Sequence, residues 1–535
     1  RSPKCHHHGQ QGRSIAYVTC TPPTAFLQVV TFMLSLRFLW WSFIFLAWIP
    51  FWHLWNETFL SIIHSEFPSR VGGKWRTFIG SRSNSGSTLK RGSNPKSPIH
   101  LHLALTDNPS QVLIQFSSMN EGIPVALYGW KGDGDEEKAI GTSTTLSSTD
   151  LCQPSKNSQS IIMTAPRHWH TVVLSNLQPN TRYHYQVGIT VGQGIIWSES
   201  VHSFQSPPTL AVEESSPYSF VVLANQGTTT AAKESIQAIA QLVEHSSQLQ
   251  SSNDPAVMIH AIHHLGGLSY ARGNITVWEE WLQWIQVYAS KVPLMVVVGS
   301  TEYDYLTGSN DPSGVNQSYQ PIWGNYGNND SGGECGVVLS KLFTMPRGGN
   351  GVFWYKHEAS PLHTTLVLSS EHDLSPSSPQ YQWLQEQFQQ IPADHWIIVE
   401  IHRPLYMNQA QWSDNNVGLG LRRSLEPLIK KHRVHLILSG HYHPYFRSCP
   451  GLWQSKCHNG GPTHITLGSA GIVPLNGTND ANDKWYDASW AAKTMGEDIR
   501  GFGIVTVHNR STLEFQYMGL DPNGQHVLDH VWMTK

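Results

Sequence analysis

The sequence predicts an N-terminal all-β sandwich followed by an α/β domain in which helices flank buried sheets. Two observations predict this fold class. Between residues 98 and 208, short strands and turns follow one another with no helical period between them. From residue 216 to residue 535, strands that are apolar throughout alternate with amphipathic helices, which indicates sheets covered on both faces.

The residues before the sandwich are expected to be a leader and a linker. The chain begins with Arg1, but Met33 to Arg37 and the apolar run Phe38 to Trp55 have the layout of a secretory signal, so translation is expected to start at Met33. Residues 1–55 are therefore interpreted as a leader. An uncleaved signal anchor stays open, because the apolar run borders on the length of a membrane span. Residues 56–97 are interpreted as a low-complexity linker, because residues 70–97 are rich in Ser, Gly, Arg and Lys and predict a flexible basic segment.

Cysteines and glycosylation sequons favour the same secretory route. Cys449 and Cys457 bracket a short loop and are the predicted disulfide, whereas Cys152 and Cys335 could pair or one could be free. The protein is expected to be secreted, extracellular or endomembrane, with a signal-anchored form as the alternative. Asn-x-Ser/Thr sequons predict glycosylation, at Asn56, Asn274, Asn316, Asn329, Asn476 and Asn509.

Charge is nearly balanced, with 35 Lys and Arg against 38 Asp and Glu. A balanced chain has no general electrostatic attraction to polyanions, so no nucleic-acid partner is expected. The binding partner is left unknown, and a homo-oligomer remains among the alternatives.

Each domain has its own run of predicted elements. Sandwich strands are predicted at 100–105, 112–116, 171–174 and 180–188, and the step from Leu177 to Tyr183 is similar to a fibronectin type III corner. The sandwich carries no cluster of catalytic residue types, so binding or scaffolding is its expected role. In the second domain, strands are predicted at 218–224, 255–261, 293–299, 364–368, 396–400 and 435–438, and helices at 231–244, 277–289, 384–390 and 421–431.

A pair of histidines follows one of these strands. The apolar run Leu436 to Leu438 stops at Ser439-Gly440, and His441 and His443 come directly after it. On extended backbone both rings would point to the same side and could approach metal ions in one cleft. The carboxyl end of a strand in an α/β sheet is also where ligands usually bind. We therefore expect a site here.

Several motifs together resemble those of the purple acid phosphatase family. They are Gly440–His443, His402–Tyr406, His264–Gly273, Asp330–Val337 and Ser370–Asp373, and the resemblance runs from about residue 97 to residue 530. It implies a β-sandwich in front of a metallophosphoesterase domain that hydrolyses phosphomonoesters. It also implies a dinuclear centre of ferric iron with zinc, manganese or iron, in which a bridging carboxylate and a hydroxide lie between the two cations.

The chain keeps only part of the ligand set that the resemblance implies. Four family ligands are present, namely Tyr270, His402, His441 and His443. Four positions differ: Asn225 replaces an aspartate, Gly267 the bridging aspartate, Ser300 an asparagine and Thr301 a histidine. Glu302 is considered as a rescue ligand, although a cap or turn after its strand is the favoured interpretation.

The missing carboxylates matter most. Gly267 has no side chain, so no rotamer can restore the bridge. Asn225 could offer a carbonyl oxygen, but a neutral amide does not offset a cation's charge. Thr301 removes an imidazole expected to meet the phosphate or the leaving group. Together these losses predict that no conventional dinuclear centre forms.

Three interpretations follow from this ligand set. The favoured one is an inactive homologue kept for binding, without a metal cofactor. In the second, a single divalent metal, for which zinc is the first choice, is held by His402, His441 and His443. The protein would then hydrolyse phosphomonoesters slowly. In the third, these histidines are packed into a filled cleft.

Other residues have simpler expected roles. His263 is expected at the surface or next to the site, and His372 and Asp373 are expected to form a structural hydrogen-bonding pair. Helical spacing places three tryptophans in the core or at an interface, namely Trp278, Trp281 and Trp284.

Overall fold

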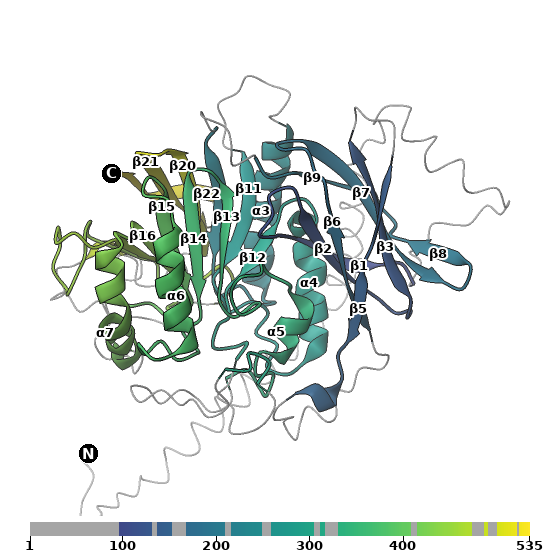
Figure 1. Ribbon diagram of the computed structural model, residues 1–535, viewed down its shortest axis with the longest axis horizontal. Helices are drawn as coiled ribbons and strands as arrows, with labels where there is room; N and C mark the ends of the chain where they lie inside the picture. The colour runs from purple at the N-terminus through teal and green to yellow at the C-terminus, as the bar shows by residue number, and fades with distance from the viewer. Residues whose placement is uncertain are drawn as a thin grey trace, which may run out of the picture. The chain divides into compact units, whose positions relative to one another are not determined.

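The computed structural model describes residues 96–130, 136–151, 167–208, 216–248, 258–303, 311–315, 330–407, 415–472, 486–489, 500–521 and 524–535. The predicted leader and nearly all of the predicted linker lie outside these residues. Among the described residues, no helix is both long enough and apolar enough to cross a membrane. The elements are drawn in Figure 1.

The N-terminal part is a β-sandwich, as predicted. One sheet has the strand order β1-β2-β6-β5, and the other has the order β4-β3-β7-β8, with β9 also paired to β7. Alternate residues of β7, including Tyr183, Tyr185 and Val187, are buried in the core between the sheets, as the period of a strand requires. The strands are β1 Ile99–Leu105, β2 Val112–Ser118, β3 Ile123–Trp130, β4 Glu137–Ile140, β5 Thr142–Thr145, β6 His168–Leu174, β7 Arg182–Val191, β8 Gly194–Trp197 and β9 His202–Gln205, with a 3-10 turn at Ser148–Asp150.

The second domain contains two larger mixed sheets. Their orders are β12-β11-β10-β20-β21-β22 and β13-β14-β15-β16-β18-β17-β19. Strands β10, β11 and β12 run parallel, and so do β14, β15, β16 and β18. The strands are β10 Tyr218–Leu223, β11 Ile259–His264, β12 Leu294–Val296, β13 Tyr355–Ser360, β14 His363–Leu368, β15 Trp396–Ile401, β16 Leu436–Ser439, β17 Phe446–Ser448, β18 Thr463–Thr466, β19 Tyr486–Ser489, β20 Arg500–Asn509, β21 Thr512–Asp521 and β22 Gly524–Thr534.

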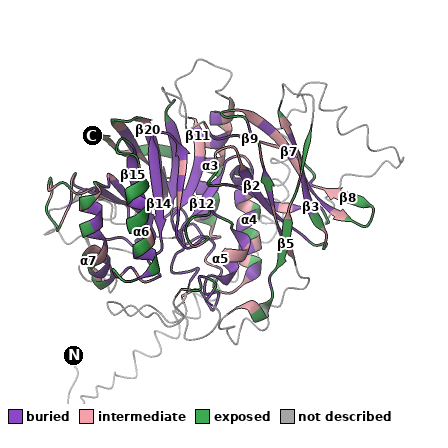
Figure 2. Ribbon diagram, in the orientation of Figure 1, coloured by how far each residue is buried: buried purple, intermediate pink, exposed green. Residues whose placement is uncertain are grey.

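Helices pack against these two sheets and share their hydrophobic cores. They are α3 Thr230–Gln248, α4 Ile275–Ala289, α5 Val337–Leu342, α6 Pro379–Gln390 and α7 Asn415–Lys431. The sequence of β15 is apolar almost throughout because each face of the strand is buried in a different core. Trp396 and Ile398 face the core shared with the first sheet, whereas Ile397 and Val399 pack with α6 and α7. Figure 2 shows the central strands buried along their length.

A buried contact between a histidine and a glutamate joins the two sheets and corrects one expectation. His263 on β11 is fully buried and so does not lie at the surface, and its Nδ1 lies 2.6 Å from Oε1 of Glu400 on β15. Both side chains are at most 1% exposed. Glu400 occupies the face of β15 that meets the other sheet, where an unpaired carboxylate would be costly to bury. The pair therefore tethers the sheets across their shared core.

The sandwich packs directly against helix α4. The backbone N–H of Leu101 donates to Oε1 of Gln286 at 2.9 Å, and the Tyr185 hydroxyl donates to the carbonyl of Ser290 at 2.8 Å. Sandwich residues such as Trp169 also belong to the same hydrophobic core as the α4 residues. The tryptophans of α4 behave largely as predicted, since Trp278 and Trp281 are buried and Trp284 is half-buried under Lys233.

The predicted disulfide between Cys449 and Cys457 is present, and Cys335 is also disulfide-bonded. Replacing both Cys449 and Cys457 by alanine is expected to lower the free energy of unfolding by about 2–3 kcal/mol, because the unfolded chain regains the freedom of a short loop. Urea denaturation of the variant and the parent at pH 7 measures this difference. An unchanged midpoint would show that the loop is held by other contacts.

Candidate functional site

The candidate site is built from loops that follow five parallel strands. Asn225 follows β10, Gly267 and Tyr270 follow β11, Ser300 to Glu302 follow β12, His402 follows β15, and His441 and His443 follow β16. Backbone hydrogen bonds fasten these loops together, from Asn225 N–H to Gly266 at 3.1 Å and from Gly440 N–H to His402 at 2.9 Å. The strand ends thus bring all the sequence-predicted positions to one region, as ligand sites in α/β folds require.

Several site residues lie on backbone in the left-handed region. The φ angles are +52° at Asn225, +56° at Tyr270 and +60° at His441. His441 is therefore not on extended backbone, which corrects the geometric reason given for the histidine pair. Its ring lies 5.1 Å from that of His402, whereas His443 lies beside Tyr270. Left-handed backbone at non-glycine residues is a feature of functional sites.

The His402 ring is oriented and hydrogen-bonded like that of a metal-binding histidine. Its Nδ1 donates to the carbonyl of Leu265 at 2.7 Å, which leaves Nε2 as the acceptor nitrogen. That Nε2 is buried and has no hydrogen-bond partner among the described residues. Burial, followed by the neighbouring His441, holds the pKa of His402 well below its usual value. The ring is therefore a neutral imidazole with an available lone pair.

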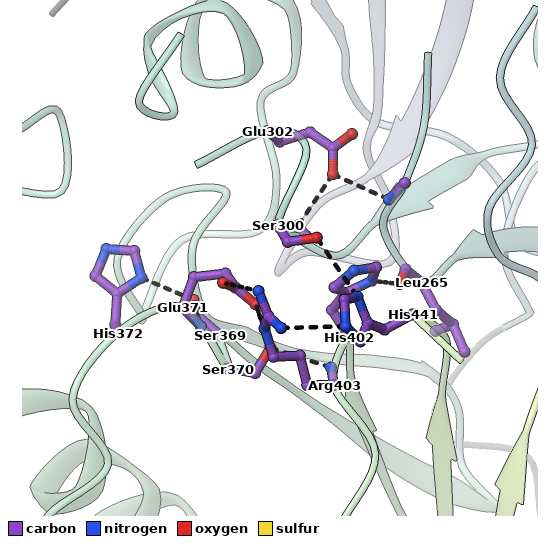
Figure 3. A network of polar contacts seen from close by, with 12 residues as sticks. Leu265, Ser300, Glu302, Ser369, Ser370, Glu371, His372, His402, Arg403 and His441 are labelled. Carbon is purple, nitrogen blue, oxygen red and sulfur yellow. Dashed lines mark hydrogen bonds and ion pairs between the residues drawn. The ribbon is translucent and has the colours of Figure 1, made fainter. Parts of the chain in front are cut away.

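His441 lies beside a fixed cation. Nη1 of Arg403 is 3.1 Å from His441 Nε2, and Ser300 Oγ is 3.5 Å from His441 Nδ1. Arg403 is held in turn by Glu371, with Nε–Oε1 at 2.8 Å and Nη2–Oε2 at 3.3 Å, and both side chains are at most 4% exposed. Figure 3 shows this chain of contacts. A buried guanidinium next to His441 would repel a dication bound there.

Of the other two retained ligands, Tyr270 bonds to Asn225, the residue that replaced an aspartate, and His443 lies next to Tyr270. The Tyr270 hydroxyl donates to Oδ1 of Asn225 at 3.2 Å and lies 3.5 Å from Nε2 of His443. Asn225 Nδ2 donates to the carbonyl of Gly468 at 3.2 Å. Burial, and then the charge of Glu302, raises the pKa of Tyr270, so this residue stays a neutral phenol. A phenol bonded to an amide is a poor substitute for a tyrosinate beside a carboxylate.

Gly267, at the position of the bridging carboxylate, has little room for a side chain. A Cβ placed there would lie 2.7 Å from Oδ1 of Asn225 and 3.1 Å from a carbon of the Tyr270 ring. The φ of Gly267 is +67°, which also disfavours most side chains. Asn225 would have to move before a carboxylate could bridge two metals here.

Glu302 is engaged by the backbone of two loops. Its Oε2 accepts from the N–H groups of Gly267 at 3.0 Å and Gly299 at 3.1 Å. Its Oε1 accepts from Leu268 N–H at 2.8 Å and from the Thr301 hydroxyl at 2.7 Å. Burial raises the pKa of Glu302, and these hydrogen bonds act in the opposite direction. This bonding fits a residue that holds two loops together, which goes beyond the expected cap or turn after its strand.

The donor set does not fit the dinuclear centre that the family resemblance implies. Both carboxylates are replaced, and Asn225 occupies the space at Gly267. Across the described residues, no three His, Cys, Asp or Glu side chains converge closely enough to hold a metal ion. The arrangement supports hydrogen bonding within the site, and no hydrolytic step through a metal follows from it.

Some functional-site details differ from the sequence-based expectations. His372 and Asp373 do not pair with each other, because His372 Nδ1 lies 2.7 Å from Ser369 Oγ and Asp373 accepts from Ser375. The ion pair of Arg403 with Glu371 was not predicted, although Arg403 directly follows His402 in the sequence. The position of Arg403 directly after His402 could have suggested a cation in the site.

Family models match three successive regions of the chain. They are described as "Purple acid Phosphatase, N-terminal domain" at residues 98–206, "Calcineurin-like phosphoesterase" at residues 233–445 and "Iron/zinc purple acid phosphatase-like protein C" at residues 461–530. The matched regions cover the sandwich and most of the second domain.

Relatives of similar sequence occur in plants. "Probable inactive purple acid phosphatase 27" of Arabidopsis thaliana is 26% identical over 79% of this chain and 67% of its own length. "Probable inactive purple acid phosphatase 9" of the same plant is 29% identical over 79% of this chain and 65% of its own length. The chain thus spans about two thirds of the length of these relatives.

A solved structure has the same fold. The purple acid phosphatase PPD1 from yellow lupin seeds superposes with a TM-score of 0.69 at 23% identity, over 83% of this chain and 75% of that chain. At this level of identity the likeness concerns the fold alone.

Proposed function

Because the chain belongs to the purple acid phosphatase family, we propose that it retains the family scaffold as a binding protein and does not carry out metal-dependent phosphoester hydrolysis. The observation that carries this proposal is the lack of room for a side chain at Gly267, the position of the bridging carboxylate. Asn225 Oδ1 lies 2.7 Å from where a Cβ would be. Two cations a few ångströms apart need that bridge to offset their repulsion.

The neighbouring contacts support the same proposal. Tyr270 bonds to an amide, and Arg403 brings a buried positive charge to His441. Tyr270, His441 and His443 therefore each have a polar side chain beside them, whereas Nε2 of His402 has no hydrogen-bond partner among the described residues. Binding a metal ion would require these contacts to break without a carboxylate to compensate for them.

Metal content and turnover test the proposal directly. We expect protein secreted from a eukaryotic host to contain no stoichiometric metal by elemental analysis, and to hydrolyse p-nitrophenyl phosphate no faster than buffer between pH 5 and pH 7. The matched variant His402→Ala should have the same metal content and the same rate of p-nitrophenyl phosphate hydrolysis as the parent. Two metals per chain with turnover that His402→Ala abolishes would overturn the proposal.

A single zinc site is the second candidate, and one observation favours it. Nε2 of His402 is buried and has no hydrogen-bond partner among the described residues, while its Nδ1 donates to a backbone carbonyl. Zinc-binding imidazoles usually donate their other ring N–H in this way. One zinc per chain that is lost in His402→Ala, together with faint turnover, would favour this candidate over the metal-free protein.

We also propose that the protein passes through the secretory pathway. The Cys449–Cys457 disulfide supports this route, as disulfides persist in oxidising compartments. Asn509 is exposed at the end of β20, and Asn274 is partly exposed. Four other sequons lie outside the described residues, namely those at Asn56, Asn316, Asn329 and Asn476. In the same expression experiment, a fall in mass on enzymatic removal of N-glycans supports the route, and an unchanged mass contradicts it.

A further inference from the structure

A pocket separate from the strand-end site lies between helix α7 and the loop that the Cys449–Cys457 disulfide closes. Its volume is about 350 Å³, and none of the candidate ligand positions lines it. Arg422, Arg423 and Glu426 come from α7, and Trp453 comes from the loop between Cys449 and Cys457. The volume is at the lower end of the range for small-molecule sites, which suits a ligand with a single ring.

Positive charge dominates the pocket and its rim. The guanidinium of Arg422 lies 4.4 Å over the ring of Tyr406, and Arg423 is exposed. Neither arginine forms an ion pair within the described part of the chain. Lys430, next to the pocket, places its ammonium 4.6 Å over the ring of Trp453.

The single carboxylate of the pocket is already engaged. Glu426 is 9% exposed, and it accepts hydrogen bonds from the Tyr406 hydroxyl and from the backbone N–H of Gln454, the latter at 3.1 Å. The Tyr406 oxygen in turn accepts from the N–H of Ser455 at 3.1 Å. Glu426 therefore fixes the loop to the helix, and the two arginine side chains remain to meet a ligand.

We propose that this pocket binds a phosphate or sulfate monoester carried on a sugar ring. Guanidinium groups bind such oxyanions through paired, charge-assisted hydrogen bonds, and both Arg422 and Arg423 line this pocket. Trp453 offers a flat aromatic wall and Leu419 an apolar one, against which the ring of the ligand packs. This inference goes beyond the proposed function, since none of its residues belongs to the strand-end site.

Calorimetric titration of the secreted, folded protein tests the proposal. Glucose 6-phosphate and glucose 6-sulfate are the probes, and glucose and inorganic phosphate are the reference ligands. We expect at least one probe to bind about tenfold more tightly than either reference ligand, because it combines the anion with the ring. The tighter probe identifies which ester the pocket prefers. Equal binding of inorganic phosphate would overturn the proposal.

A matched pair of variants locates the binding. Arg423→Gln removes the charge of an exposed side chain that forms no ion pair with the described residues. The loss of one charge-assisted contact is expected to weaken binding of the preferred probe about tenfold. Lys431→Gln removes the same charge from an exposed position of α7 that does not line the pocket, and should leave the affinity unchanged. Equal affinities of both variants and the parent would contradict the assignment of this pocket.

Discussion

Lowering the pH from 7 to 5 is expected to reduce the free energy of unfolding by several kcal/mol. The cause is a set of buried neutral histidines outside the candidate site. Burial lowers the pKa of His100, His363 and His464 to about 3 and that of His260 to about 4. In the unfolded chain these side chains titrate near their ordinary value of about 6.5.

The sign of the effect follows from proton binding. Between pH 6.5 and about pH 4 the unfolded chain binds protons at these four positions and the folded chain does not. Stability is therefore complete above the unfolded pKa and falls as the pH decreases, by up to roughly 1.4 kcal/mol per pH unit for each histidine. Acid turnover assays consequently need a check that the protein is still folded.

Urea denaturation at pH 7, 6 and 5 measures this slope. His464→Gln removes one buried imidazole and should make the slope shallower, whereas His458→Gln, at an exposed position, should leave it unchanged. A free energy of unfolding that stays constant from pH 7 to pH 5 would contradict the prediction, because it would mean that these histidines protonate equally in both states.

Replacing Glu302 by alanine is expected to lower the free energy of unfolding by about 3–6 kcal/mol. The variant would leave three buried backbone N–H groups without an acceptor, those of Gly267, Leu268 and Gly299. Each such group costs about 1–3 kcal/mol, and relief from burying a carboxylate offsets part of the total. Glu302→Gln keeps the shape and one acceptor oxygen, so its loss should be smaller.

Thermal and urea unfolding at pH 7 measure the effect of Glu302→Ala. Glu280→Ala is the matched control, because Glu280 is exposed on α4 and its removal should change stability by no more than about 0.5 kcal/mol. If Glu302→Ala were as stable as the control, water or a rearranged loop would have to satisfy the three donors, and Glu302 would not be what holds the loops together.

The fold class followed from the sequence because its signals are local. Alternation identified the sandwich, and apolar strands such as β15 are apolar on both faces because each face meets a separate core. The strands β20 to β22 were not predicted, although Phe502 to Val507 is an almost wholly apolar run. Element ends also shifted, since α7 begins at Asn415 and not at residue 421.

The positions of the site could be predicted, but its contacts could not. Motif order identified the strand ends that carry His402 and His441. That Arg403 meets His441 depends on side-chain geometry between segments 38 residues apart, and that Asn225 blocks Gly267 depends on a left-handed backbone. The pairing of His263 with Glu400 likewise joins residues 137 apart on different sheets. Such contacts have no signature in local sequence patterns.

The packing of the sandwich on α4 has a geometric consequence for any partner that it recruits. Leu101 and Tyr185 form hydrogen bonds with α4. Trp281 on the same helix donates to Oε1 of Gln226 at 2.9 Å, and Gln226 directly follows Asn225 in the sequence. A macromolecule held by the sandwich is therefore presented to the strand-end loops at a fixed angle and distance. Its local concentration there is set by a rigid spacer and not by a flexible tether.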